Sequence, residues 1–456
     1  MESLLEQFSE RCPVAVMARL GLQRAVGAEW VEAVFAEHRG MQYTRELAFS
    51  TVVDLMALVA VGLQPSLHAA ARKHPSLGVS ITSLYNKVNA TDPGLIRALV
   101  RGSATRLEPV RDALPGSRAA ALPGYRVRVV DGNHLPASEK RLGPLRGHRG
   151  AALPGQSLVV SDLETLLVTD IVPCEDGHAS EQGLLSVLLA DAAPGDLWIG
   201  DRNFCTRAAI LAARARGAHV LFREPTGHPR PTEEGAWVAR GRVETGEVLE
   251  QRVSIPSEEG AVELRRIEVR LDAPTEDGDT TLRLLTTLPA AVEAPELARL
   301  YRQRWSIERL FGQLESALQS EVRTLGHPRA ALLAFGLAVV AYNVLNVMEA
   351  ALAAAHRDEE EVPISTYQLV GDVRLHFGTL AAMIDGATWE GLDAESPARL
   401  ARRLLRIAGR VDLERLRKFP KRAGPKKRVG YAPRPEVEKH VATARVLAAQ
   451  RSAKRP

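Results

Sequence analysis

The stretch that decides the fold of this chain runs Tyr301-Arg302-Gln303-Arg304-Trp305-Ser306-Ile307-Glu308-Arg309-Leu310-Phe311-Gly312-Gln313-Leu314-Glu315. No proline interrupts it, and its apolar residues recur at helical spacing, which predicts one helix from about Glu296 to about Leu318. One arc of roughly 60° then carries a ring hydroxyl, a guanidinium and two carboxylates, from Tyr301, Arg304, Glu308 and Glu315. The neighbouring arc is apolar and is expected to face a core; it consists of Leu300, Ile307, Leu310, Phe311, Leu314 and Leu318. On spacing alone, a solvated helix face with i,i+4 ion pairs is an equally good interpretation.

Two aspartates upstream each stand at the end of a short apolar run, Val127–Asp131 and Asp196–Asp201. Runs of this kind predict strands in a covered sheet, and open α/β sheets place their ligands at the carboxyl ends of strands. Asp131, Asp201 and Glu308 therefore form a candidate catalytic and metal-binding set. Their oxygen atoms suit Mg²⁺, with Mn²⁺ as a substitute, and no His/Cys set at zinc spacing competes for the role.

The spacing Tyr301-x2-Arg304-x3-Glu308, after two strand-end aspartates, resembles the Tyr-Arg-Glu-Lys signature of DDE transposases of the IS-four type, which belong to insertion sequences. The aspartates also stand in similar settings, Asp131-Gly132-Asn133 and Asp201-Arg202-Asn203-Phe204-Cys205-Thr206. The resemblance covers roughly residues 126–315. It departs at one position, because Glu315 stands where the family has Lys, and a carboxylate there would repel a phosphate.

This resemblance implies an α/β fold with a ribonuclease-H-like catalytic core and an antiparallel β insertion, flanked by helical N- and C-terminal regions. It implies two Mg²⁺ ions held by the three carboxylates, which cut the ends of the element and join the freed 3′-OH to target DNA. Tyr301 and Arg304 are expected to bind phosphates beside the scissile bond. The implied partner is double-stranded DNA, as terminal inverted repeats and target, bound by a homodimer in a synaptic complex.

Two alternatives stay open. The Glu315 substitution motivates a catalytically silent, transposase-derived protein that only binds DNA. A nuclease that cuts without strand transfer would need the same three carboxylates.

The order of helical and strand-like patterns predicts five regions. They are a helical N-terminal DNA-binding region (1–120), the first part of the core (121–223), a β-rich insertion (224–290), the second part of the core with the glutamate helix (291–355) and a helical, basic C-terminal region (356–456). In the first region, helices at Leu67–Lys73 and Ser80–Val88 predict either a helix-turn-helix-like module or an ordinary small bundle.

Two residues near the insertion are further DNA-binding candidates. Arg223, at the end of the last core strand, is a candidate phosphate contact. Trp237 is either a platform for an unpaired base or a ring packed on its own sheet. The insertion itself is predicted from alternating runs at Ala236–Val243, Val248–Ile255, Val262–Leu271 and Thr280–Thr287.

Charge is unevenly distributed along the 456 residues. The segment from Arg415 to Pro456 has fourteen Lys/Arg and two Glu, a net +12, so the preceding 414 residues carry −8 of the total of +4. This tail, with Lys426, Lys427 and Arg428 as candidate DNA contacts, fits phosphate backbones. A disordered, solubilising tail is the alternative.

The resemblance implies a bacterial, nucleoid-associated protein of the cytoplasm. Three scattered cysteines suit a reducing compartment, and no signal peptide is visible at the N-terminus. Residues Ala330 to Met348 contain no charged residue and approach the length of a membrane span. Polar residues in the middle of the segment favour a buried core helix instead, so no membrane partner is expected.

Overall fold

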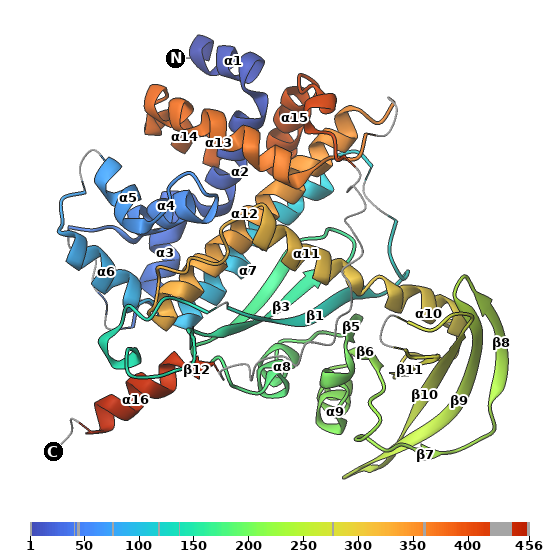
Figure 1. Cartoon of the computed structure of the whole chain (residues 1–456). Coiled ribbons are helices and arrows are strands. Elements are labelled where there is room, and N and C mark those ends of the chain that lie inside the picture. Colours follow the sequence, from blue (N-terminus) through green and yellow to red (C-terminus); the bar gives the residue numbers. More distant parts are fainter. Residues whose placement is uncertain are drawn as a thin grey trace, which may run out of the picture.

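A computed structural model describes residues 2–40, 42, 46–74, 77–116, 119–135, 137–275, 278–358, 362–419 and 440–453. Its centre is a mixed sheet, covered on one face mainly by a layer of helices (Figure 1). Five strands form the core of the sheet in the order β4-β3-β1-β5-β6. These strands are β1 (Arg126–His134), β3 (Gln156–Asp162), β4 (Val168–Cys174), β5 (Asp196–Gly200) and β6 (His219–Arg223).

The strand directions are those of a ribonuclease-H-like core. β1, β3 and β4 pair antiparallel, whereas β1, β5 and β6 pair parallel. Parallel neighbours need a crossover, and helices α8 (Glu181–Leu189) and α9 (Arg207–Ala215) precede and follow β5 in that role. The predicted fold class is therefore confirmed.

The insertion is antiparallel, as predicted, and it continues the core sheet. β11 pairs with β6, with Leu284 opposite Arg223. Through this pairing the five inserted strands extend the five-stranded core to a sheet of ten strands. The long hairpin of β9 and β10 curves away from the core (Figure 1). The inserted strands are β7 (Thr232–Glu233), β8 (Val238–Val243), β9 (Gly246–Ser257), β10 (Gly260–Leu271) and β11 (Thr281–Thr286).

Helix α12 (Pro328–Ala355) is the centre of the helical layer. Among the described residues it is the one helix long and apolar enough to cross a membrane, but its most apolar stretch is entirely buried against other helices and the sheet. Asn343 lies in that stretch: its Oδ1 accepts from the Val168 N–H at 2.8 Å and its Nδ2 donates to the Val168 carbonyl at 2.9 Å. The amide thereby satisfies backbone groups of edge strand β4. As predicted, α12 is a core helix of this fold.

The helical layer is built from both ends of the chain. The N-terminal helices are α1 (Glu2–Arg11), α2 (Pro13–Val26), α3 (Ala28–His38), α4 (Phe49–Ala60), α5 (Leu67–Lys73), α6 (Ile81–Asn89) and α7 (Pro93–Asp112). The C-terminal helices are α13 (Thr366–Met383), α14 (Gly386–Asp393), α15 (Pro397–Ala408) and α16 (Thr443–Ala453). Of these, α2, α4, α6, α7 and α15 contact α12 directly, whereas α16 lies against other elements. Short elements complete the fold: β2 (Ala152–Leu153), β12 (Val441–Ala442) and the 3-10 turns η1 (Gly143–Leu145), η2 (Arg202–Phe204) and η3 (Leu413–Leu416).

Helices α5 and α6 confirm the two helices predicted near the N-terminus. The second of these helices, α6, is held to the rest of this region through Lys87. Its Nζ donates to the Leu47 carbonyl at 2.6 Å and lies over the Phe35 ring. The exposed positions of α6 include Ser83 and Asn86.

The single helix predicted from about Glu296 to Leu318 is wrong. The structure has two helices, α10 (Ala294–Arg302) and α11 (Trp305–Ser316), separated by a turn at Gln303 and Arg304. Short i→i−3 bonds replace the helical ladder there, from the Arg304 N–H to the Tyr301 carbonyl and from the Ile307 N–H to the Arg304 carbonyl. Both helices still bury their apolar faces, as predicted from the spacing.

Candidate active site

The register of β1 and β5 places the two aspartates at matching positions. The parallel pairing ends with Val129 opposite Ile199, and Asp131 and Asp201 each follow two residues later. Asp201 comes directly after β5, as predicted. Asp131 does not end its strand, because β1 continues to His134 in its pairing with β3. The strand-end description of Asp131 is therefore corrected: it lies inside β1, at the point where the parallel neighbour stops.

Arg304 connects β1 with α11. Its Nη2 lies 2.8 Å from the Glu308 Oε1, and its Nη1 lies 3.4 Å from the Asp131 Oδ2. The guanidinium is nearly buried, with 10% of the side chain exposed, whereas 38% of the Glu308 side chain is exposed. Two of the three predicted carboxylates are thus held together by a cation from the turn that breaks the predicted helix.

The surroundings of Asp131 disfavour its ionised form. Burial raises its pKa from 3.8 to about 6, and the nearby carboxylates of Glu181 and Asp201 add to the rise. The Gly132 N–H, which donates to Asp131 Oδ1 at 2.9 Å, and the Arg304 guanidinium oppose it. Burial is the main cause of the rise, and the three carboxylates of Asp131, Glu181 and Asp201 outnumber the one guanidinium that faces them, so a cation would be favoured here.

Glu181, at the start of α8, is a fourth carboxylate here, which sequence reasoning missed. It packs where a side chain on residue 132 would lie: a Cβ added to Gly132 would be 1.7 Å from the Glu181 Oε1. Its Oε2 accepts from the Asn203 Nδ2 at 2.6 Å, just after Asp201. The only sequence signal is indirect, since a glycine directly after Asp131 permits this close approach.

Tyr301 and Arg304 both lie on the buried side of the site. Tyr301 is 4% exposed and belongs to the core under the sheet, and burial raises the pKa of its hydroxyl. Among the described residues, the Tyr301 hydroxyl and the Arg304 Nε have no hydrogen-bond partner. Trp305, which the sequence reasoning did not single out, is 60% exposed beside them, with the Arg304 guanidinium 5.6 Å from its ring centre.

Glu315 is exposed near the end of α11. Its charge helps raise the pKa of Glu321, after the larger effect of burial, so the two carboxylates are neighbours. Arg323, a candidate for neutralising Glu315, forms no ion pair with it in the described part of the chain. Glu315 therefore adds negative charge to this surface, as the sequence suggested.

Of the other candidate DNA contacts, Arg223 and Trp237 both contact residues of the insertion. Arg223 forms an ion pair with Asp279 of the insertion at 2.5 Å. Trp237 is half-buried, and the Arg283 guanidinium lies 6.0 Å from its ring centre, so the ring is partly covered by its own sheet. Three further candidates, Lys426, Lys427 and Arg428, lie outside the described residues.

The donor set suits a hard cation in its chemistry. Asp131, Asp201 and Glu308 offer only oxygen, and the excess of negative charge around Asp131 would be neutralised by a divalent ion. Within the described residues, no three His, Cys, Asp or Glu side chains are close enough together to hold a metal ion. Instead, the Arg304 guanidinium bridges Asp131 and Glu308 in this structure.

The segment that contains these residues matches a known protein family. Residues 122–344 match the family model described as a transposase DDE domain. This match supports a DDE transposase. The matched segment begins just before β1 and ends within α12, so it contains all three predicted carboxylates.

No curated protein matches the chain. Among solved structures, it is similar to a piggyBac transposase, determined by cryo-electron microscopy as a synaptic complex with hairpin DNA. The identity is 12% and the TM-score 0.38, with 86% of this chain and 85% of that chain covered.

Proposed function

We propose that this protein is the DDE transposase of an insertion sequence of the IS-four type, which cuts DNA at the ends of the element and joins them to target DNA. The observation that carries the proposal is the arrangement of Asp131 and Asp201 at matching positions on neighbouring strands, with Glu308 tied to Asp131 through Arg304. The transposase family match over the same residues supports it.

The three carboxylates would hold Mg²⁺. When bound, two such ions would lower the pKa of an attacking water and stabilise the leaving 3′ oxygen. Asp131 and Asp201 are fixed by the sheet, so their oxygens are positioned in advance. Glu308 lies on a helix that Arg304 anchors to β1. When the carboxylate oxygens bind Mg²⁺, the Arg304 guanidinium would no longer be paired with them and could bind a DNA phosphate. Its planar fork of N–H groups matches the geometry of phosphate oxygens.

DNA contacts around this centre follow from the exposed side chains. Trp305 presents its ring beside the carboxylates and would stack on an unpaired base. The basic C-terminal tail would contribute phosphate contacts without sequence specificity. We propose that two copies hold the two ends of the element together.

The test uses a supercoiled plasmid that carries the DNA flanking the gene, with its inverted repeats. We expect Mg²⁺-dependent cleavage by the wild type, and loss of at least about a thousandfold in Asp201→Asn and Glu308→Gln, because each removes a charged oxygen ligand. DNA binding should be retained. Glu37→Gln, which changes an exposed carboxylate on α3, is the matched control. Cleavage by either site variant at the wild-type rate would refute the assignment.

The second candidate is the silent DNA-binding protein, favoured by Glu315. A wild type that binds the ends and never cleaves them would establish it. Cleavage without joining to a target plasmid would instead establish a nuclease.

A further inference from the structure

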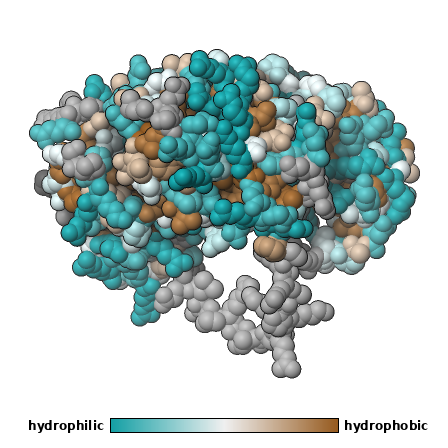
Figure 2. Space-filling view, turned by 90° about the horizontal axis from the view of Figure 1, so that it is seen from above, coloured by the Kyte–Doolittle hydropathy of each residue, from teal (hydrophilic) through white to brown (hydrophobic). Residues whose placement is uncertain are grey.

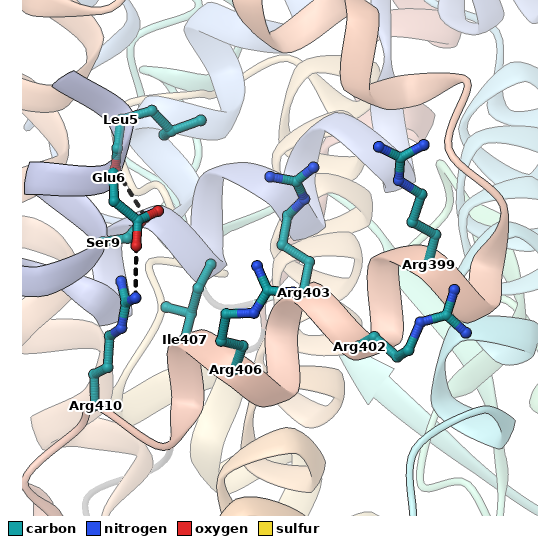
Figure 3. Close-up of a pocket in the computed structure, with 9 residues that line it drawn as sticks. All are labelled: Leu5, Glu6, Ser9, Arg399, Arg402, Arg403, Arg406, Ile407 and Arg410. Carbon is teal, nitrogen blue, oxygen red and sulfur yellow. Dashed lines mark hydrogen bonds and ion pairs between the residues drawn. The ribbon is translucent and has the colours of Figure 1, made fainter. Parts of the chain in front are cut away.

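We infer that a groove between α1 and α15, remote from the carboxylates, binds the phosphate backbone of double-stranded DNA. Five arginines line the groove, which has a volume of about 570 Å³: Arg399, Arg402, Arg403, Arg406 and Arg410. Figure 3 shows them along α15 and the residues just after it, with α1 across the groove. This inference rests on the proposed function only in its choice of DNA as the source of phosphate.

The sequence of α15 separates charge from apolar residues completely. Between Pro397 and Arg410 there are five arginines and no acidic residue, in a part of the chain that is net negative before Arg415. The arginines at positions 399, 402, 403 and 406 share one face of α15, and Arg410 follows just after the helix, while Leu400 and Leu404 are buried on the other face. Ile407 is buried at the edge of the arginine face and also lines the groove. Packing of α15 on α12, α7 and α2 holds this arginine face in place.

Some of these arginines form ion pairs with carboxylates of the protein, and others do not. Arg403 pairs with Glu395 at 2.5 Å, and Arg410 pairs with Glu6 of α1 at 2.5 Å. Arg402 and Arg406 are exposed, and within the part of the chain that the structure describes neither forms an ion pair. Two guanidiniums in a concave site therefore have no counter-charge from the protein, and phosphate is the anion that their fork geometry binds best.

Duplex DNA fits this site better than a small phosphate. From Arg399 to Arg406 the arginine face rises about 10 Å along the helix axis, at about 1.5 Å per residue, and Arg410 extends it beyond the end of α15. This exceeds the length of one phosphate group and suits successive phosphates of a strand. The groove is open to solvent on a largely hydrophilic face: Figure 2 views the molecule from above, the side on which α1 and α15 lie in Figure 1.

The experiment measures binding of the full-length protein to a 40-base-pair duplex of random sequence, without divalent metal, over a range of salt concentrations. Each phosphate that the protein no longer neutralises lowers the log–log salt slope by about 0.9. Arg402→Gln combined with Arg406→Gln should therefore reduce the slope by about 1.8 and weaken binding about 60-fold at 0.1 M salt. The matched control combines Arg214→Gln and Arg216→Gln, two exposed arginines near the end of α9 that form no ion pair among the described residues.

A third variant should act in the opposite direction. Glu6→Gln releases Arg410 from its ion pair, so we expect tighter binding, by up to about 8-fold at 0.1 M salt, and a steeper slope. An effect of this sign cannot arise from damage to the fold. Pyrophosphate, added at the phosphate concentration of a competing duplex, tests the source of the phosphate: it should compete far less well than the duplex.

Two results would overturn the inference. One is an unchanged salt slope in the Arg402/Arg406 double variant, and the other is pyrophosphate competing as well as DNA. Plasmid cleavage with Mg²⁺, measured in parallel, separates this inference from the proposed function. Wild-type cleavage with an unchanged slope in the double variant refutes the groove alone, whereas a changed slope without any cleavage by the wild type refutes the transposase activity alone.

Discussion

Replacing Asp131 by Asn removes a charge that destabilises the metal-free fold. Burial, together with Glu181 and Asp201, raises the pKa of Asp131 from 3.8 to about 6. A difference of this size makes the ionised carboxylate unfavourable by about 3 kcal/mol relative to the unfolded chain. Asn keeps the shape, and its Oδ1 can still accept from the Gly132 N–H. Its amide group would face the Arg304 guanidinium donor to donor, which costs about 1–2 kcal/mol. The variant should therefore be more stable by about 1–2 kcal/mol at pH 7.5.

The sign of the pH dependence follows from the direction of the shift. Below pH 3.8, Asp131 is neutral in both the folded and the unfolded chain, so its ionisation costs nothing. The cost grows as pH rises from 3.8 to about 6 and is complete above that value. About half of it is present at pH 5. The stabilisation by Asp131→Asn should therefore be clearly larger at pH 7.5 than at pH 5.

Asp196→Asn is the control with the opposite sign. Burial alone would raise the pKa of Asp196, but hydrogen bonds from Arg126, from the Ala193 N–H and from Arg128 lower it below its usual value. The stability that this carboxylate contributes is lost only below its ordinary pKa, so Asp196→Asn should destabilise the protein equally at pH 5 and pH 7.5.

The assay is urea unfolding of the three proteins with EDTA present, at both pH values and equal ionic strength. A less stable Asp131→Asn at pH 7.5, or a gain that does not change with pH, would refute this reasoning. The same variant should have no cleavage activity, so that stability and activity change in opposite directions.

Three further predictions concern the site and its surroundings. Gly132→Ala should displace Glu181 and lower cleavage roughly 10–100-fold, because it breaks the hydrogen bond between Glu181 and Asn203 that steadies the turn after Asp201. Adding Glu181→Ala to this variant should cause no further loss of cleavage, and an additive loss would contradict the explanation. Glu315→Lys should tighten binding of cleaved ends, with Glu315→Gln intermediate, when titrated at two salt concentrations; a loss of cleavage would show that Glu315 has another role. Deleting the chain after Lys418 should reduce the salt slope by about 0.9 for each phosphate that the tail neutralises, and an unchanged slope would make the tail a solubilising segment.

The sheet was largely predictable from the sequence, because its strands alternate or are wholly apolar and are separated by turn residues. The two core strands predicted at Val127–Asp131 and Asp196–Asp201 and the four predicted strands of the insertion are all present, with ends within about three residues of those observed. The pairing of β11 with β6 was not predictable, since which edge an inserted hairpin joins depends on contacts between residues more than sixty positions apart.

The candidate site was predictable only in part. The spacing from Arg304 to Glu308 correctly indicated an i,i+4 pair, which forms at 2.8 Å. It gave no sign that the helix would break at Gln303, because no proline or glycine stands there. Glu181 carried no signal either, since it approaches Asp131 only through the packing of α8 against the sheet.

The break at Gln303 coincides with other departures from stable packing. The buried Tyr301 hydroxyl and Arg304 Nε make no hydrogen bond of good geometry among the described residues, although the Arg304 side chain lies close enough to the hydroxyl to oppose the rise in its pKa that burial causes. The helical hydrogen-bond ladder is interrupted at the same turn. A fold optimised for stability alone would have neither feature, and both lie within four residues of one another, beside the destabilising charge of Asp131. Such departures from stable packing concentrate where a protein needs particular groups in place for its function. This concentration, more than the spacing of carboxylates, distinguishes the centre at Asp131 and Arg304 from an ordinary charged helix face.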